Sequence, residues 1–158
     1  DPRLPVVTGR EELHRPFRPT AARWVASALA VVVLVFMVTL ALVLPAVAGE
    51  GVGLPDRVGI AGFGVAVSWF LGRQAGVRAD PDETGLTVRN LLLTRRVEWA
   101  EIVSVRFGQG RPWVQLDLAD GDTLSVMGVQ SADGARASAE AVRLSTLVAL
   151  HSTTRSDD

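Results

Sequence analysis

The feature that most constrains this 158-residue chain is an unbroken apolar run, WVASALAVVVLVFMVTLALVLPAV, from Trp24 to Val47. Its 24 residues include no charged side chain. About 20 apolar residues are enough for a helix to cross the ~30 Å hydrocarbon core of a bilayer. A secretory signal peptide is the main competing interpretation, but its apolar region covers only ~7–15 residues. We therefore predict a transmembrane helix here.

A second apolar segment, VGIAGFGVAVSWFL, covers residues 58–71 after a glycine-rich turn. These 14 residues would span only about 21 Å at ~1.5 Å per residue. A helix extended over residues 55–77 would be long enough, with Arg57 and Arg73 reaching toward the interfaces. We expect a second crossing, which makes residues 24–77 a transmembrane hairpin. A re-entrant or interfacial helix is the alternative.

Small residues recur on one face of this second segment. Gly64, Ser68 and Gly72 are spaced every four residues, so they share a helix face. Small side chains at this spacing let two membrane helices approach closely. The partner is either the first helix of the hairpin or another membrane protein, and the spacing does not decide between them.

The arginines predict the orientation of the hairpin. One arginine, Arg57, lies between the two apolar segments, and five precede Trp24: Arg3, Arg10, Arg15, Arg18 and Arg23. Because cytoplasmic flanks are rich in basic residues, we expect a multi-pass cell-membrane protein with the N-terminal arm, residues 1–23, and the C-terminal region in the cytoplasm. If the second segment does not cross, the C-terminal region lies outside.

Four prolines interrupt the arm, which predicts an extended or irregular conformation. Its arginines are interpreted as orientation signals. Contact with anionic headgroups, worth ~1 kcal/mol for each basic residue, is the alternative.

Short runs of alternating polar and apolar residues follow the hairpin, which is typical of strands. Asp120 and Gly121 predict a tight hairpin turn between two of them. Closely spaced strands indicate an antiparallel meander or a small barrel. An amphipathic helix is predicted at residues 133–152, and a polar tail at 153–158. The predicted strands cover residues 85–93, 94–99, 102–107, 113–118 and 123–129.

Four short stretches of this region form a recognisable pattern: Gly85-Leu86-Thr87-Val88-Arg89, Val97-Glu98-Trp99-Ala100-Glu101-Ile102, Val105-Arg106-Phe107 and Asp120-Gly121 with Leu124. With this pattern, the region resembles the bacterial PH-like (pleckstrin-homology-like) domains, and is most similar to the actinobacterial membrane-anchored type that includes the low-molecular-weight protein antigen 6 group. The resemblance covers roughly residues 78–130, and the preceding hairpin matches the layout of that type. It implies an α+β fold, with a partly open antiparallel β-barrel closed by the C-terminal helix over residues 78–152.

Local physics also accounts for the most distinctive part of this pattern. We expect Trp99 and Ile102 to pack in the core where one strand passes to the next. Glu98 and Glu101 would then face solvent or cap a turn.

The sequence offers little catalytic chemistry. The absence of cysteine excludes disulfides and thiolate metal sites. The two histidines, His14 and His151, have no nucleophile or carboxylate at motif spacing. Asp117, Asp120 and Asp122 fit a hairpin turn better than half of a calcium loop. We therefore expect no enzyme activity, no metal, no cofactor and no small-molecule substrate.

Charge also argues against phosphate-rich partners. Residues 79–158 carry eight arginines and twelve acidic residues, a net charge of −4, which disfavours nucleic acid and lipid headgroups. Only Arg95, Arg96 and Arg111, expected in loops, could bind a headgroup. The loop at Arg111 also presents Trp113 as a contact residue, although Trp113 fits the core equally well.

These observations predict a non-catalytic, membrane-anchored interaction module or accessory subunit of a larger respiratory, secretory or cell-envelope complex. Its expected partners are the lipid bilayer and other membrane-protein subunits. The alternative is a peripheral module that senses lipid headgroups at the cytoplasmic membrane face.

Overall fold

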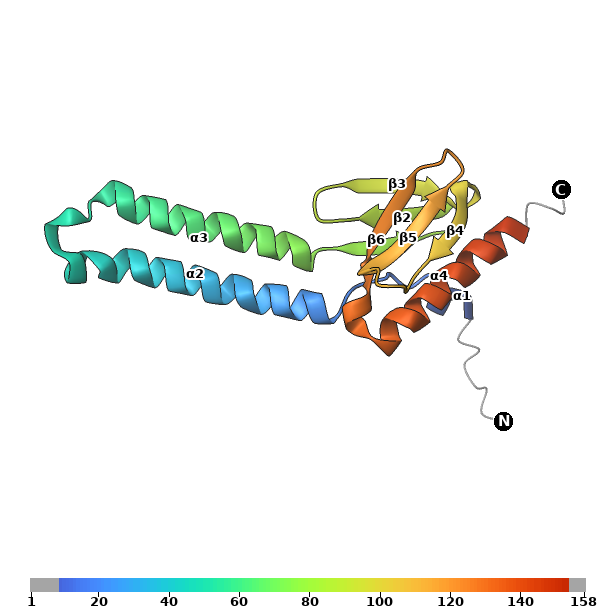
Figure 1. The fold of residues 1–158 in the computed structure, drawn as a ribbon, viewed down its shortest axis with the longest axis horizontal. Coiled ribbons are helices and arrows are strands. Elements are labelled where there is room, and N and C mark those ends of the chain that lie inside the picture. Colours follow the sequence, from blue (N-terminus) through green and yellow to red (C-terminus); the bar gives the residue numbers. More distant parts are fainter. Residues whose placement is uncertain (1–8, 154–158) are drawn as a thin grey trace. The chain divides into compact units, whose positions relative to one another are not determined.

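A computed structural model of the protein describes residues 9–153 and divides the chain into two compact units (Figure 1). One unit is a helical segment, Ala21–Gly76. The other combines the described residues up to Thr20 with those from Val77 onward. The described part of the N-terminal arm therefore belongs to the same folded unit as the C-terminal half. Arg3 and the predicted tail beyond Thr153 lie outside the described residues.

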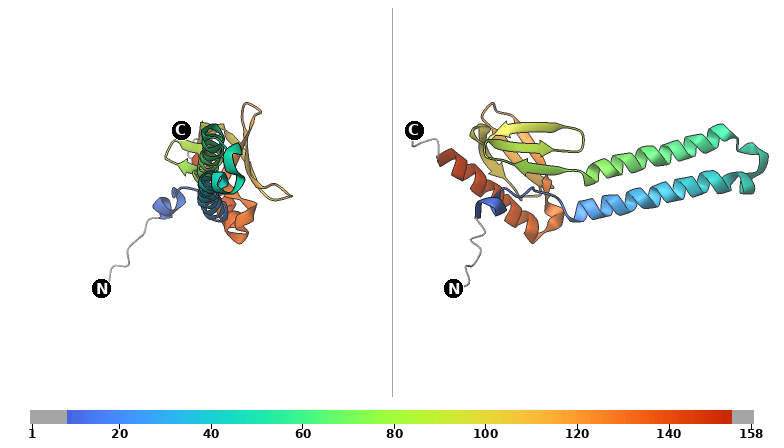
Figure 2. Two further views of the ribbon diagram at one scale, coloured as in Figure 1. Left: turned by 90° about the vertical axis from the view of Figure 1, so that its left-hand side faces the viewer. Right: turned by 180° about the vertical axis from the view of Figure 1, so that it is seen from behind.

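The helical unit is a hairpin of two antiparallel helices, α2 (Ala21–Ala48) and α3 (Leu54–Ala75), which lie side by side (Figure 1 and Figure 2). A short 3-10 turn, η1 (Gly49–Gly51), follows α2. The carboxylate of Asp56 accepts the backbone N–H of Gly53 at 2.9 Å, which caps the start of α3.

Helix α2 is the one helix in the described part of the chain that is long and apolar enough to cross a membrane. Most of its side chains are exposed rather than buried in a protein core, with Val31 62% and Leu42 63% exposed. Such a helix needs an apolar environment that the described residues do not provide. Helix α3, with 22 residues, does not meet the same criterion. The structure thus supports one candidate crossing where the sequence predicted two.

The other unit contains two antiparallel three-stranded sheets, with strand orders β1-β2-β3 and β4-β5-β6. The predicted single barrel is not what the described residues form. The 3-10 turn η2 (Trp99–Glu101) separates β3 from β4, so each strand remains in its own sheet. The strands are β1 (Arg78–Pro81), β2 (Gly85–Arg89), β3 (Thr94–Glu98), β4 (Ile102–Arg106), β5 (Trp113–Leu118) and β6 (Thr123–Gln130).

The predicted C-terminal helix is confirmed as α4 (Ala135–Thr153), which follows a 3-10 turn, η3 (Ser131–Asp133). One face of α4 packs into the core of this unit through Ala137, Ala141, Leu144, Leu147 and Val148, as its spacing predicted.

Trp99 and Ile102 are buried in that same core, as predicted, at 3% and 5% exposure. The carboxylate of Glu101 accepts the backbone N–H of Glu98 at 2.7 Å, so it caps the turn between β3 and β4. The predicted local roles of this motif are therefore confirmed.

The arm is not simply extended or irregular, which corrects the sequence-based expectation. A short helix, α1 (Gly9–Leu13), precedes Phe17, whose side chain is completely buried in the core. Backbone hydrogen bonds of 2.8 and 2.9 Å join Phe17 to Ala79 in an antiparallel bridge. Strand β6 passes close by at Gly128, where a Cβ would lie 2.8 Å from the carbonyl oxygen of Phe17. Glycine is therefore required at that point.

Candidate interaction surfaces

An arginine of α3 repairs a defect in the hydrogen bonding of α2. Pro45 lies inside α2 and has no N–H, so the carbonyl of Ala41, four residues earlier, has no helical donor. The Nε of Arg57 donates to that carbonyl oxygen at 3.0 Å. Neighbouring helices commonly satisfy carbonyls freed by proline in membrane helices.

The small-residue face of α3 divides into two parts. A Cβ at Gly64 would lie 2.5 Å from the Cβ of Met37 in α2, so the close approach of the helices depends on glycine. The hydroxyl of Ser68 donates to the carbonyl of Ala30 at 2.9 Å. A Cβ at Gly72 would meet nothing within 4 Å among the described residues. Gly64 and Ser68 thus face α2, whereas Gly72 leaves room for another contact.

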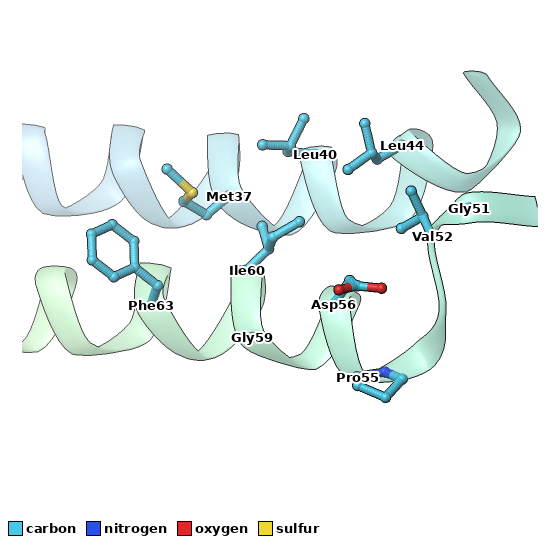
Figure 3. Close-up of a pocket in the computed structure, with 10 residues that line it drawn as sticks. All are labelled: Met37, Leu40, Leu44, Gly51, Val52, Pro55, Asp56, Gly59, Ile60 and Phe63. Carbon is cyan, nitrogen blue, oxygen red and sulfur yellow. The ribbon is translucent and has the colours of Figure 1, made fainter. Parts of the chain in front are cut away.

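A groove lies between the two helices near the connecting turn (Figure 3). Its volume is about 750 Å³ and its lining is mostly apolar, with Met37, Leu40 and Leu44 from α2 and Ile60 and Phe63 from α3. Such a lining suits a lipid acyl chain or an apolar side chain better than a polar ligand.

The predicted contact arginines do not converge on one site. Arg95 and Arg96 lie within β3 rather than in a loop. Arg95 bonds Asp120 and Asp122 at 3.4 and 3.3 Å. Arg96 bonds Asp82 through two nitrogens at 2.6 and 3.0 Å.

The remaining two predicted contact residues lie near the start of β5. The Nε of Arg111, in the loop between β4 and β5, donates to the side chain of Gln115 at 3.0 Å. Trp113 is half-buried as the first residue of β5. Arg111 is therefore hydrogen-bonded within the domain and Trp113 is partly covered, so neither side chain is fully available to a ligand.

Neighbouring groups lower the pKa values of two carboxylates, those of Asp82 and Asp117. The Arg96 guanidinium, with further donors from Thr84 and the Gly85 backbone, keeps the pKa of Asp82 well below its ordinary value. The hydroxyl of Ser104, followed by Arg106, lowers the pKa of Asp117. Carboxylates stabilised in this way are poor proton donors, which argues for a structural role.

Arg143 of α4 fastens the arm to the folded unit. Its guanidinium lies 3.8 Å from the centre of the Phe17 ring. It also donates to three carbonyl oxygens at and just after the end of α1, those of Glu12 at 3.2 Å, Leu13 at 2.9 Å and Arg15 at 2.7 Å. One half-buried side chain thus binds the C-terminal end of α1 and covers the buried phenylalanine.

The fold also brings the two histidines together. His151 stacks on Trp99 with 4.9 Å between ring centres, and His14 meets His151 edge-on at 5.9 Å. Within residues 9–153, no group of three or more histidine, aspartate or glutamate side chains is arranged to hold a metal. The cluster is best described as packing between the arm and the end of α4.

A basic cavity of about 360 Å³ lies between the arm and α4, lined by Arg15, Pro16, Arg18 and Arg136. Arg15 pairs with Glu140 at 3.5 Å. Sequence reasoning missed this site because Arg136 is distant from the arm in the chain and carries no motif.

Comparison with known proteins gives a family match over the strands and part of α4. Residues 74–144 match the family model of a bacterial PH domain. The matched range runs from the end of α3 through both sheets and into α4. The predicted resemblance to bacterial PH-like domains is confirmed at this level.

Uncharacterized proteins of Mycobacterium bovis and of two strains of Mycobacterium tuberculosis are 35% identical to this chain over 94 residues. The aligned region covers 60% of this chain and 61% of each relative. The chain therefore spans less than two thirds of the length of the relatives it matches. No solved structure matches significantly.

Proposed function

We propose that this protein is a non-catalytic interaction module in which a two-crossing hairpin anchors the PH-like domain to a membrane as an accessory subunit of a larger complex. One observation carries the anchoring part of this proposal. Both ends of the helical unit, Ala21 and Gly76, continue into the same folded unit, at Thr20 and Val77. A folded domain occupies one side of a membrane, so a chain that leaves through α2 must return before Val77.

Helix α3 is long enough to make that return. Its 22 residues extend about 33 Å at ~1.5 Å per residue, which exceeds a hydrocarbon core of ~30 Å. Contacts at Arg57, Gly64 and Ser68 keep it against α2 along much of its length. A helix lying flat at the interface would not follow its partner in this way, so these contacts favour a second crossing.

The arginines that precede α2 favour a cytoplasmic location for the PH-like domain. A hairpin followed by a PH-like domain is also the layout of the low-molecular-weight protein antigen 6 type, and the mycobacterial relatives agree with an actinobacterial origin for that type. We extend the family assignment to this type as part of the proposal.

Two observations support the role of a non-catalytic subunit: the way the carboxylates are held, and an open position on the surface of α3. The carboxylates with depressed pKa values are held by ion pairs and hydrogen bonds rather than poised for proton transfer. The open position at Gly72 on α3 is suited to close contact with another membrane helix. A respiratory, secretory or cell-envelope complex would supply such a helix.

The basic cavity favours a second candidate function, the sensing of lipid headgroups. Three arginines line it, and one of them, Arg18, precedes the first residue of α2, Ala21, by three positions. A phosphate there would meet basic side chains close to the membrane surface.

Site-directed labelling tests the topology. The native chain has no cysteine, so Gly51→Cys in the hairpin turn and Val103→Cys on β4 each give one reactive site. A membrane-impermeant maleimide should label position 51 in intact cells and position 103 only after lysis. Labelling of both positions from the same side would refute the second crossing.

Purification in a mild detergent followed by mass spectrometry tests the role of subunit. We expect co-purifying membrane proteins that are lost in Gly72→Leu and retained in the matched variant Gly59→Leu, because a Cβ at position 59 also meets open space. A chain that runs alone as a monomer under these conditions would refute the proposal. Loss of binding to anionic vesicles in the double variant Arg18→Gln with Arg136→Gln would instead favour headgroup sensing.

A further inference from the structure

Two adjacent leucines are exposed at the tip of the β2–β3 hairpin. Leu92 is 70% and Leu93 is 74% exposed. They belong to the four-residue connection between the two strands, which we call the leucine loop (residues 90–93). Exposed neighbouring leucines are unfavourable in water unless another apolar phase covers them.

The register of the sheet places the leucine loop at the end where the chain leaves for the hairpin. Arg89, the last residue of β2, pairs with Arg78, the first residue of β1. Arg78 follows Gly76, the last residue of the helical unit, by only two positions. On the other side of β1, Phe17 bridges Ala79, and the chain enters α2 four residues later. Both chain connections and the leucine loop therefore share one end of this sheet.

The leucine loop is held rigidly by Asn90. Its side-chain amide donates to the carbonyl of Ser125 at 2.7 Å, and its side-chain oxygen accepts the N–H of Met127 at 3.1 Å. The backbone N–H of Asn90 also bonds the carbonyl of Leu93 at 2.8 Å. The loop is thus fixed to β6 of the other sheet, and the exposed leucines are presented without a large loss of loop entropy on binding.

Arginines surround the same end of the sheet. Arg78 and Arg89 are register partners, and the antiparallel bridge at Phe17 places Arg18 on the same side as Arg78. Arg89 is exposed, whereas Arg78 is paired with Asp80 at 2.7 Å. Although the domain has a net negative charge, this end carries a local basic rim of Arg18, Arg78 and Arg89.

We propose that the leucine loop and its basic rim form a second membrane contact, which seats the PH-like domain on the anionic leaflet from which the hairpin enters the bilayer. Leu92 and Leu93 insert at the level of the headgroups, and the arginines bind lipid phosphates. This inference rests on the proposed insertion of the hairpin. Leucine insertion and headgroup charge act together because apolar burial and electrostatic attraction both contribute to interfacial binding.

Fluorescence quenching in lipid nanodiscs tests this contact with the full chain. Leu92→Cys, and Leu150→Cys as a control, are each labelled with an environment-sensitive fluorophore. Residue 150 lies near the C-terminal end of α4, about 22 Å along the helix from its first residue, Ala135, at ~1.5 Å per residue. The turn before α4 lies at the chain exit, because the carboxylate of Asp133 accepts the backbone N–H of Thr20. Quenchers carried on lipid chains near the headgroups should quench position 92 severalfold more than position 150 in phosphatidylglycerol-containing nanodiscs.

The charge contribution is tested in the same system. Arg89→Gln should lower the ratio of lipid-bound to unbound PH-like domains by about fivefold, as expected for the loss of one basic contact at an anionic surface. Arg89→Lys should leave this ratio unchanged. Equal quenching at positions 92 and 150 overturns the proposal. The proposal is also overturned if, in detergent without lipid, a bound protein covers the fluorophore at position 92. Quenching that is the same in neutral and anionic nanodiscs and unchanged by Arg89→Gln overturns the role of the arginines.

The topology experiment separates this failure from failure of the proposed anchoring. If position 51 is labelled from outside but position 92 is not quenched, the hairpin crosses and only the second contact is wrong. If position 51 is labelled from the same side as the domain, the anchoring proposal itself is wrong.

Discussion

Replacement of Arg57 by methionine should destabilise the hairpin, and replacement of Pro45 by alanine should remove most of that effect. The bond between Arg57 and the carbonyl of Ala41 is useful because Pro45 cannot donate to that carbonyl. In the Pro45→Ala variant, the N–H of residue 45 takes over the carbonyl of Ala41. The carbonyl of Ala41 then no longer needs a hydrogen bond from Arg57.

The expected free energies follow from this geometry. A hydrogen bond from a charged donor contributes about 1.5–3 kcal/mol, and a buried carbonyl without a donor costs about 1–3 kcal/mol. Side-chain bonds between membrane helices average only about 0.6 kcal/mol and reach about 1.7 kcal/mol. We therefore expect Arg57→Met to cost about 1–2 kcal/mol in the native background and less than about 0.5 kcal/mol beside Ala at position 45. The coupling energy would be about 1 kcal/mol, within the usual range for residues in direct contact.

Equilibrium unfolding of the hairpin in mixed micelles measures this cycle. A donor and an acceptor dye on two introduced cysteines, one in each helix, report separation of α2 from α3. Ser68→Ala is the control, because Ser68 bonds Ala30 and the helical donor for that carbonyl, Leu34, is intact. Its cost should be the same in both backgrounds. If Arg57→Met lowers the free energy of unfolding as much in the Pro45→Ala background as in the native one, the contact does not stabilise the hairpin by satisfying the carbonyl that Pro45 leaves without a donor.

Three further predictions concern packing and charge. Gly64→Ala should separate the helices and cost about 1–3 kcal/mol, whereas Gly72→Ala should be neutral or stabilising; the same unfolding assay compares them. Phe17→Ala should cost the PH-like domain about 3–5 kcal/mol, seen as a lower thermal midpoint and faster tryptic cleavage of the arm. The pKa of Asp82 is depressed, chiefly by its bond to Arg96, so its contribution to stability is present above the ordinary value of 3.8 and declines as the pH falls below it. Thermal unfolding across that pH should show a weaker acid dependence in Arg96→Gln, and an unchanged dependence would contradict this account.

Much of the PH-like domain could be predicted from its sequence because its strands alternate cleanly. The five predicted strands and the amphipathic helix are all present, with bounds that differ mainly at their ends. Strand β1 was missed because it has only four residues, of which two are charged and the last is Pro81. The sequence predicted a turn at η2 but did not indicate that the strands on its two sides belong to different sheets.

The surfaces were harder to predict because they are built from distant parts of the chain. The arm contains one buried aromatic residue, Phe17, among prolines and charges, and no periodicity marks it as core. Arg57 was expected to reach for the membrane interface, whereas it bonds a carbonyl whose availability depends on a proline in another helix. The acidic partners of Arg95 and Arg96 lie elsewhere in the sequence. Their ion pairs could therefore not be predicted, and both arginines remained candidates for ligand contacts.

The bridge between Phe17 and Ala79 has a consequence for biosynthesis. Phe17 leaves the ribosome before the hairpin, yet the core that it completes requires strands made after the hairpin. If the hairpin inserts as proposed, the domain can close only when both helices have been delivered and the chain has returned to its starting side. A chain whose second helix failed to return would leave the phenylalanine across the membrane from its binding site. The completed domain would then distinguish correctly inserted chains from misinserted ones, and the latter would present an unfinished core to cellular proteases.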